Sequence, residues 1–451
     1  MHRSLPFPPL FLAISLVLVA NASLSAADWP QFQGPQRNGT STETGLNLTA
    51  WGNDGPPLLW EKTLNEGWGG AAIVGDEVFL VDRDLGERDR LLCLSLADGA
   101  ELWQVSYDFP GKLPHPGSRG VPLVEDDAVY FISGFGQVFR VSRTSHQIDW
   151  MISIQEQYGA EPPKWGWAQS PIVVGDILIV PAMSAEVGLV GLDKNTGKER
   201  WRTEGVGNSH STPTVLTLQG VEQAVFVSTG GGEGEVGTTI SVRPDTGEVL
   251  WKTHVYFNKI PIPFPTKVTE ELVFLTGGYG NGSHMIRVKA GQPQWSVESV
   301  FPMTQGTQVH PPFLIDDHLY FLANENDNHK GEARLTGGLT CMKPDGTILW
   351  HTGDQPFMGR GNMILVDGHL LIQDGEVGYL RVVDPSPDGY REVGFADAFG
   401  KKSEVDDQIA KQEGKENLKI PDFKYWSPMA LSEGRLIVRG QDMMRCFDLR
   451  N

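Results

Sequence analysis

The stretch Gly191–Trp201, GLDKNTGKERW, ends in a glycine, three polar residues and a tryptophan. The spacing Gly-x-x-x-Trp occurs at Gly99–Trp103, Gly197–Trp201, Gly247–Trp251, Gly291–Trp295 and Gly346–Trp350. Trp150 fits the phrase without the glycine, and Gly389–Val393 fits it without the tryptophan. Successive phrases end between 43 residues (350 to 393) and 55 residues (295 to 350) apart. A period near 50 residues indicates a repeat architecture.

A second, independent series consists of short acidic or glycine turns between apolar runs. Runs rich in Val, Ile, Leu and Phe around such a turn are typical of tight β-hairpins. Eight of them occur, at 72–81, 123–132, 171–180, 214–227, 267–275, 313–322, 363–372 and 429–438. The sequence therefore predicts one hairpin in each of eight repeats.

Eight hairpins but only seven tryptophan phrases leave the last repeat one strand short. The chain ends soon after Cys446, whereas Pro56–Lys62, PPLLWEK, precedes the first hairpin and carries Trp60. We expect Leu58–Trp60 to pair with the strand that holds Cys446, which closes a ring and removes open sheet edges. The prediction is an all-β fold: one eight-bladed β-propeller of four-stranded antiparallel blades over residues 57–451, closed by an N-terminal strand.

The glycine–tryptophan phrase has a structural explanation in such a ring. Glycine permits the positive φ of the turn into the outermost strand, and the indole packs between neighbouring blades. The three cysteines, Cys93, Cys341 and Cys446, stand in similar phrases of separate repeats. Equivalent positions of different blades are too far apart for a disulfide, so we expect three small buried hydrophobic residues.

The N-terminus has the pattern of a secretory signal peptide. Arg3 precedes the apolar run Pro9–Ala20, and small residues follow, with cleavage expected after Ala26 or Ala27. The alternative is a retained membrane anchor, but 12 apolar residues are short for a span of roughly 20. The first cysteine is Cys93, so no lipid anchor is predicted. We expect export to the periplasm or beyond, and no transmembrane segment once residues 1–27 are removed.

Two segments lie outside the repeats. Residues 28–56 are expected to form an irregular leader that crosses one face of the ring. Residues 400–424 form a charged insertion between the seventh and eighth blades, solvated and with a short helix. The formal charge is −19, from 37 Lys and Arg against 56 Asp and Glu. Such a surface repels phosphate backbones and anionic lipid, so no nucleic-acid partner is expected.

The motif Asp193-x-x-Thr196-Gly197-x-x-x-Trp201 is similar to the tryptophan-docking motif of quinoprotein propellers. With the leader DWPQFQGP, it makes the chain resemble secreted bacterial PQQ-like repeat proteins, the group that includes BamB. The resemblance implies the fold more strongly than an activity, because the motif belongs to the contacts between blades. Quinoprotein dehydrogenases of this fold use PQQ with calcium, a catalytic acid and often a vicinal cysteine pair, and the sequence has no Cys-Cys pair.

A metal site is not predicted, because the sequence lacks CxxC, HxH and HExxH spacings. One pattern does point to a ligand: the residue seven positions before each hairpin turn, where the innermost strand begins. Read by blade, these positions are Trp68, Arg119, Ala168, His210, Pro263, Val309, Arg360 and Trp426. Innermost strands line the channel of a propeller, so these side chains should gather at one mouth. Trp165, Trp167 and His310 lie near them in the sequence.

Blades seven, eight, one and two then present two arginines around two tryptophans. Such a set suits a planar or anionic ligand. The candidate ligand-binding residues are Trp68, Arg119, Trp167, His210, His310, Arg360 and Trp426. The alternative is that both tryptophans plug the channel while the arginines pair with local carboxylates. Replacing Arg119 and Arg360 by Ala would distinguish the two, since a binding role predicts lost binding with a nearly unchanged melting temperature.

Two functions are supported by the sequence, and a third, a hydrolytic propeller, has no motif behind it. The first is an exported, non-catalytic propeller without a cofactor, which binds a protein, a glycan or a small anionic or planar ligand at the channel mouth. The second is a periplasmic PQQ-dependent dehydrogenase of alcohols or sugars that contains PQQ and calcium. No catalytic residues are predicted for either.

Overall fold

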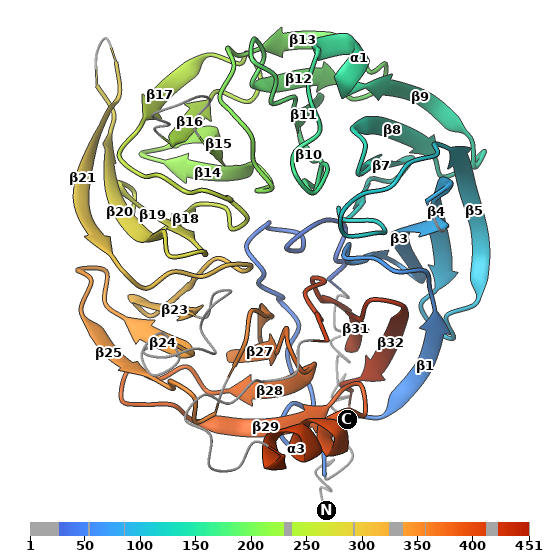
Figure 1. Ribbon diagram of the computed structural model, residues 1–451, viewed down its shortest axis with the longest axis vertical. Helices are drawn as coiled ribbons and strands as arrows, with labels where there is room; N and C mark the ends of the chain where they lie inside the picture. The colour runs from blue at the N-terminus through green and yellow to red at the C-terminus, as the bar shows by residue number, and fades with distance from the viewer. Residues whose placement is uncertain are drawn as a thin grey trace, which may run out of the picture.

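The structure is a computed structural model that describes residues 27–52, 55–84, 86–229, 237–291, 294–323, 337–356, 358–411 and 423–450. Its strands form eight four-stranded antiparallel sheets around a central axis (Figure 1). The predicted eight-bladed β-propeller is therefore confirmed. The segment predicted as a signal peptide lies outside the described residues, except for Ala27.

Each blade runs from an innermost to an outermost strand. Blades one and two contain β2 (Ala72–Val74), β3 (Glu77–Asp84), β4 (Arg88–Ser95), β5 (Glu101–Asp108), β6 (Leu123–Val124), β7 (Ala128–Ile132), β8 (Gln137–Ser142) and β9 (Ile148–Ser153). Blades three and four contain β10 (Ile172–Val174), β11 (Ile177–Pro181), β12 (Leu189–Asp193), β13 (Glu199–Arg202), β14 (Thr214–Leu218), β15 (Val221–Ser228), β16 (Thr238–Val242) and β17 (Val249–Thr253).

Blades five and six contain β18 (Thr266–Lys267), β19 (Leu272–Gly277), β20 (Gly282–Lys289), β21 (Ser296–Met303), β22 (Phe313–Ile315), β23 (His318–Leu322), β24 (Leu339–Met342) and β25 (Ile348–His351). Blades seven and eight contain β26 (Asn362–Val366), β27 (His369–Gln373), β28 (Tyr379–Val383), β29 (Glu392–Asp397), β30 (Ala430–Ser432), β31 (Arg435–Arg439), β32 (Met443–Asp448) and β1 (Leu58–Thr63). Helix α1 (Ile154–Tyr158) follows β9, and helix α3 (Lys402–Ala410) lies within the charged insertion.

The N-terminal strand closes the ring. β1 pairs with β32 in blade eight, where Leu58 lies opposite Phe447 and Trp60 lies opposite Cys446. Arg439 on β31 joins this blade to the next two and is fully buried. Its Nη1 donates to the Gly69 carbonyl at 2.8 Å and to the Ser118 Oγ at 3.3 Å. Its Nη2 lies 3.5 Å from the equally buried Asp82 carboxylate.

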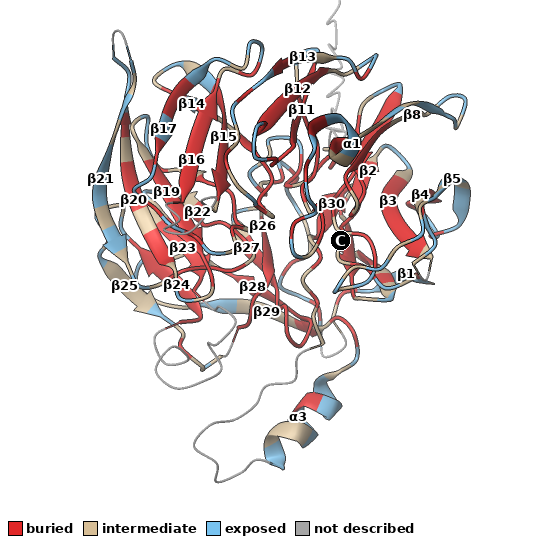
Figure 2. Cartoon of the chain, turned by 45° about the horizontal axis from the view of Figure 1, so that its top comes forward, coloured by how far each residue is buried: buried red, intermediate tan, exposed pale blue. Residues whose placement is uncertain are grey.

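The core lies between the blades. Figure 2 shows the inner strands largely buried, whereas outermost strands such as β5 and β21 alternate between exposed and partly buried residues. This contrast follows from the sequence, because inner strands are continuous apolar runs packed on both faces. The three cysteines are buried and form no disulfide, as expected.

The glycine–tryptophan phrases build the contacts between blades. Gly197 (φ 69°) lies against the indole of Trp150 in the preceding blade, and Gly247 (φ 73°) lies against Trp201. The indole of Trp201 donates to the Pro244 carbonyl of blade four at 2.9 Å. Trp60, Trp150 and Trp350 make the same kind of bond across their junctions.

Blades two and five depart from this pattern. His146 takes the glycine position of blade two with φ 56°, and its ring stacks on Trp103 of blade one at 4.5 Å. In blade five the prediction for Trp295 is wrong, because the outermost strand begins after it. Phe301 lies opposite Met285 at the position of the other tryptophans, and its ring contacts Gly346.

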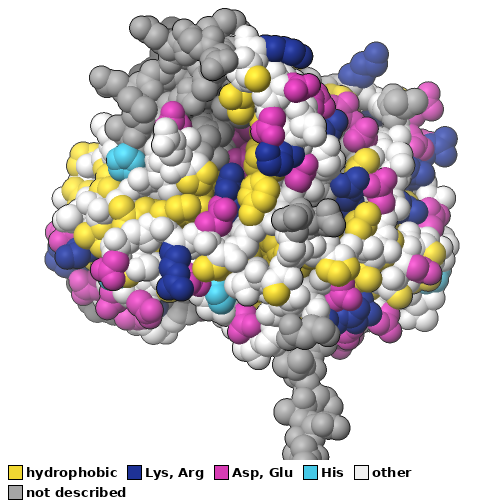
Figure 3. All heavy atoms as spheres, turned by 90° about the horizontal axis from the view of Figure 1, so that it is seen from below, with side chains coloured by type: hydrophobic (Ala, Val, Ile, Leu, Met, Phe, Trp, Pro, Cys, Tyr) yellow, Lys and Arg dark blue, Asp and Glu magenta, His cyan; other side chains and the backbone are white. Residues whose placement is uncertain are grey.

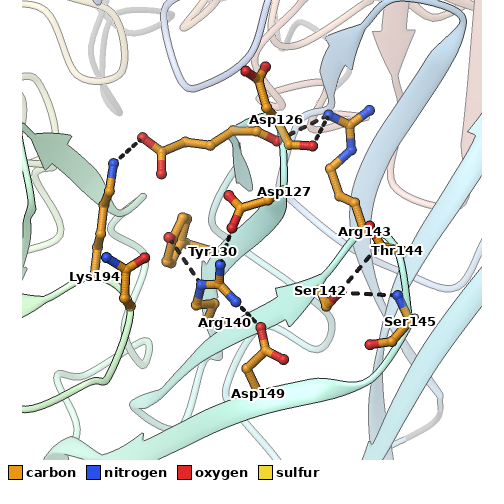
Figure 4. A network of polar contacts seen from close by, with 12 residues as sticks. Asp126, Asp127, Tyr130, Arg140, Ser142, Arg143, Thr144, Ser145, Asp149 and Lys194 are labelled. Atoms are coloured by element: carbon orange, nitrogen blue, oxygen red, sulfur yellow. Dashed lines mark hydrogen bonds and ion pairs between the residues drawn. The ribbon is translucent and has the colours of Figure 1, made fainter.

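Ion pairs also join neighbouring blades on the side of the hairpin turns. Lys194 of blade three contacts Glu125 of blade two at 2.9 Å, and Arg143 contacts Glu77 of blade one at 2.5 Å. Figure 4 shows the surrounding network, in which Arg140 lies between the carboxylates of Asp127 and Asp149. Most charged groups are at the surface, where acidic and basic side chains intermingle with apolar ones in the side view of Figure 3.

The leader crosses the centre of the ring (Figure 1, blue). Trp29 exchanges two backbone hydrogen bonds of 2.8 Å with Ile73 of blade one. Farther along, the Val173 carbonyl of blade three accepts a bond from Arg37, and the Leu365 carbonyl of blade seven accepts one from the Ser41 amide. These partners lie at the ends of innermost strands, near their hairpin turns. The leader therefore spans the channel at that end.

Candidate ligand-binding site

The opposite end of the channel holds a cavity of about 550 Å³. Seven of the eight aligned positions line it: Trp68, Arg119, Ala168, His210, Val309, Arg360 and Trp426. Each precedes the innermost strand of its blade, so the repeat register carries these side chains to one mouth. At the eighth position Ile262 lines the cavity in place of Pro263.

Two candidate residues are elsewhere. Trp167 is 1% exposed, packs on Gly136 and donates to the Pro181 carbonyl at 3.3 Å. His310 is 2% exposed and stacks on Phe313, and its Nε2 lies 3.2 Å from the Gln33 side chain of the leader. Both serve the interior, because each is next in the sequence to a position that faces the channel: Trp167 precedes Ala168 and His310 follows Val309.

Several lining residues were not predicted from the repeat. They are His115, Lys164, Trp165, Tyr279, Gln308 and Lys424, together with Phe32 from the leader. Most of them lie in connections between blades, whose path the period of about 50 residues does not set. Of these, only Trp165 was named from the sequence, because it lies three residues before the aligned position at Ala168.

Aromatic rings form a continuous arc along the lining. Trp426 and Trp68 stack with centroids 5.3 Å apart and planes at 29°. Trp68 then meets His115 at 80°, and His115 meets Trp165 at 63°. From Trp165 the arc continues to His210 at 5.1 Å and to Tyr279 at 6.3 Å. The arc extends from blade eight to blade five.

Arg119 is a cation of the lining that hydrogen-bonds to backbone carbonyls. Its Nη1 donates to the Gly117 carbonyl at 2.5 Å, and its Nη2 donates to the His115 carbonyl. No ion pair between described residues involves it. Burial lowers the pKa of Arg119 to about 10, so the group remains charged at neutral pH.

The other cations lie beside rings. Arg360 lies over the Trp426 ring at 4.6 Å and forms a buried ion pair with Glu376, behind the lining. Lys164 lies over the Trp165 ring at 5.3 Å, and Lys424 lines the cavity two residues before Trp426. No Asp or Glu belongs to the described lining. The mouth is therefore cationic, although the whole chain has a charge of −19.

The lining also holds three buried polar atoms without a hydrogen-bond partner among the described residues. They are the Trp426 Nε1, the His210 Nδ1 and the Gln308 Oε1. Burial, followed by the nearby Arg119, lowers the pKa of His210 to about 4, so the imidazole is neutral at pH 7. Burial, followed by Lys424, Arg119 and Lys164, also lowers the pKa of His115. Buried polar atoms of this kind call for a partner such as water or a ligand.

The donors present do not fit a calcium-bound PQQ. Calcium takes six to eight oxygen ligands, among which carboxylates predominate. The described lining offers no carboxylate, and no group of three or more His, Cys, Asp or Glu side chains in the described ranges could hold a metal. The same lining lacks a catalytic acid of the kind the resemblance implied. The cations and aromatic rings of the lining could bind an anion such as the quinone, but the described lining lacks the ligands for its calcium ion.

Among the described residues, no helix is long and apolar enough to cross a bilayer.

The comparisons place this architecture among known proteins. No curated protein matches the sequence. By structure, the chain is similar to BamB from Moraxella catarrhalis (11% identity, TM-score 0.53, 87% of this chain and 97% of that one). It is also similar to a europium-containing methanol dehydrogenase (11%, TM-score 0.61, 91% and 89%). A third is the quinohemoprotein alcohol dehydrogenase from Comamonas testosteroni (12%, TM-score 0.60, 95% and 81%).

At these identities the structural likeness establishes the fold alone. The sequence itself carries more, because the family model described as outer membrane protein assembly factor BamB matches residues 40–162 and 87–329, more than half of the chain. Together with the eight closed blades and the docked tryptophans, this match shows that the chain belongs to that family of PQQ-like propeller repeats.

Proposed function

We propose that this protein is an exported, non-catalytic binding module whose ligand is an anion held at the channel mouth. One observation carries the proposal: Arg119, Lys164, Lys424 and Arg360 line a cavity that has no carboxylate in its described lining. In a protein with more acidic than basic residues, most cations can have a carboxylate beside them. A concave site that keeps one sign of charge attracts the opposite one.

A binding role fits the residues better than a catalytic one. Proton transfer at neutral pH requires a group whose pKa is near 7. His210, with a pKa of about 4, is a weak base, and no carboxylate stands beside it in the lining. Export is supported by the signal-like segment over residues 1–27 and by the name of the matched family, an outer membrane protein assembly factor. That name also supports a protein partner on an outer face of the ring.

The test is ligand-induced stabilisation with matched probe pairs. Benzoate and benzamide, or galacturonate and galactose, differ in charge but little in shape. We expect anionic members to raise the melting temperature of the mature protein, neutral members to leave it unchanged, and Arg119→Ala to abolish the rise. Arg202→Ala, on the outermost strand β13, is the control and should keep the response. Equal responses to charged and neutral probes would overturn the proposal.

The alternative function, a PQQ-dependent dehydrogenase of alcohols or sugars, is favoured by the two dehydrogenases of similar fold. Its test is reconstitution of the purified protein with PQQ and calcium, followed by quinone absorbance and dye reduction with a panel of alcohols and sugars. Turnover with any of them would replace the binding module by an enzyme. We expect none, because the lining provides neither calcium ligands nor a catalytic acid.

A further inference from the structure

We infer that the anion at the channel mouth is an acidic sugar, a hydroxylated ring that carries a carboxylate or a sulfate, rather than a flat aromatic acid. The inference rests on the proposed function, whose site it shares. Three features of the lining carry it: the angles between its rings, its unpaired polar atoms, and the position of its cations.

The aromatic rings line a curved surface and do not form a slot between two parallel planes. The most nearly parallel pair, Trp68 and Trp426 at 29°, is closed, because the two rings stack on each other at 5.3 Å, while His210 and Tyr279 are tilted from the plane of Trp165 by 32° and 31°. Arg360 lies over the ring of Trp426. Beyond Trp68 the successive planes turn by 80° and then by 63°. A flat ligand gains most when it is stacked on a parallel open face, whereas the C–H face of a puckered sugar packs on single rings set at different angles.

The unpaired atoms require a ligand that both donates and accepts hydrogen bonds. Trp426 Nε1 is a donor, Gln308 Oε1 is an acceptor, and the neutral His210 leaves its Nδ1 to either role. Gln308 is 5% exposed, so its oxygen has little access to bulk water. A sugar hydroxyl can serve each of the three atoms. An aromatic carboxylate offers only acceptors at neutral pH and leaves Gln308 Oε1 unpaired.

The cations lie where a charged substituent of a stacked sugar would be. Lys164 lies over the Trp165 ring, with its Nζ 5.3 Å from the ring centroid, so a positive charge and an aromatic ring meet at one place in the lining. Arg119 is buried deeper and extends its guanidinium beside the His115 backbone. Lys164 is exposed, which places it at the rim. A short acidic oligosaccharide, with one charge on each ring, matches this distribution along a cavity of about 550 Å³.

The experiment is isothermal titration of the mature protein with four probes. They are digalacturonate, its dimethyl ester, a monosulfated galactose disaccharide, and 2-naphthoate as the flat acid. We expect digalacturonate or the sulfated disaccharide, or both, to bind at least tenfold more tightly than the ester and than 2-naphthoate. Which of the two binds identifies the acidic group. Stacking on Trp165 should also change the tryptophan fluorescence.

The outcomes separate the two proposals. If 2-naphthoate binds as tightly as the acidic sugars or more tightly, the sugar inference falls while an anion site stands. If no anionic probe binds, the proposed function falls as well. If the dimethyl ester binds as tightly as digalacturonate, charge plays no part, and both are overturned.

A variant pair tests the hydrogen-bond step directly. Gln308→Leu keeps the volume of the side chain but removes the acceptor, so it should weaken the acidic sugar about tenfold and leave any weak binding of 2-naphthoate unchanged. Gln104→Leu on the exposed rim strand β5 is the matched control and should change neither. Equal weakening of sugar and naphthoate by Gln308→Leu would contradict a hydroxyl partner. A melting curve of each variant shows that it is folded.

Discussion

The backbone amide of Asn47 donates a 2.7 Å hydrogen bond to the carbonyl of Leu449. That carbonyl occupies, in blade eight, the place of the Leu96 and Lys194 carbonyls, which accept a bond from an indole of the preceding blade. Blade seven has no tryptophan to offer, because Gly394 lies at the corresponding bulge of β29. The leader supplies the missing donor.

The leader also fills the missing volume at this junction. A side chain at Gly394 would collide with the Leu48 carbonyl. Leu48 and Trp51 are buried in the core cluster shared with blades seven and eight, and the Trp51 indole donates to the Asn47 carbonyl at 2.7 Å. One segment therefore spans the channel and completes the ring contact that the repeat lacks.

The first prediction concerns this segment. Leu48→Ala should lower the free energy of unfolding by about 2–4 kcal/mol, because it opens a cavity at the junction of blades seven and eight. Leu102→Ala is the matched control: its side chain is 52% exposed on β5, and the loss should be below about 0.5 kcal/mol. Urea unfolding of both variants measures the difference. Similar losses would show that the leader does not contribute to the core.

A second prediction isolates the contact between a glycine and the tryptophan of the preceding blade. Gly247 and Gly220 have nearly the same φ, 73° and 75°. A Cβ at Gly247 would lie 2.6 Å from the Trp201 indole, whereas a Cβ at Gly220 meets nothing within 4 Å. Gly220→Ala should therefore cost about 1–2 kcal/mol for its backbone alone. Gly247→Ala should cost a further ~1–3 kcal/mol for overpacking.

Thermal or denaturant unfolding of the two glycine variants gives the comparison. Equal destabilisation would mean that the indole shifts without strain, and that the glycine is required for its φ alone.

The sequence predicted the packing between blades correctly at Gly197–Trp201 and Gly247–Trp251, but not at Gly291–Trp295. The spacing of Gly247 and Trp251 determines the turn and the strand that follows it, and both are local. The phrase at Trp295 has the same spacing, but the β20–β21 ladder continues for four pairs between the bulge and the turn, against one pair in β4–β5, and this moves the junction to Phe301. Strand length depends on tertiary pairing, and no residue count within the phrase reveals it.

The candidate site also contains some residues that the repeat predicts and others that it does not. The aligned positions brought Trp68, Arg119 and Trp426 to one cavity, because the register of innermost strands follows from the hairpins. Lys164 and Gln308 could not be placed this way, since connections between blades differ in length and path. The pairing of Arg360 with Glu376 depends on a buried contact 16 residues away, which the repeat does not encode.

Because Arg360 forms that ion pair, its replacement should destabilise the fold more than replacement of Arg119 does. Arg360→Ala removes the guanidinium from a carboxylate that is only 6% exposed and should destabilise the fold by about 3–5 kcal/mol. Arg119→Ala removes hydrogen bonds to two backbone carbonyls and should cost about 1 kcal/mol. The earlier expectation that both variants keep the melting temperature is thus retained for Arg119 alone. Calorimetry of the two variants checks it, and an equal loss would place Arg119 in a structural role too.

The last prediction is a pH dependence from His210. Its pKa is about 4 in the folded protein and about 6.5 in an unfolded chain, so the unfolded state binds more protons between these values. The contribution of His210 to stability is therefore complete above pH 6.5 and is lost as the pH falls toward 4. Between pH 7.5 and 5.0 the loss should be about 1–2 kcal/mol. His210→Asn, which does not titrate, should lose that much less than the wild type.

His351→Asn is the control, because His351 is exposed on β25 and its replacement should leave the pH dependence as it is. The buried His310, whose pKa burial likewise lowers to about 4, is present in all three proteins and cancels from the comparison. Chemical unfolding at the two pH values supplies the numbers. If His210→Asn follows the wild type from pH 7.5 to 5.0, the imidazole has access to solvent protons in the folded state, and the cavity is more hydrated than its lining indicates.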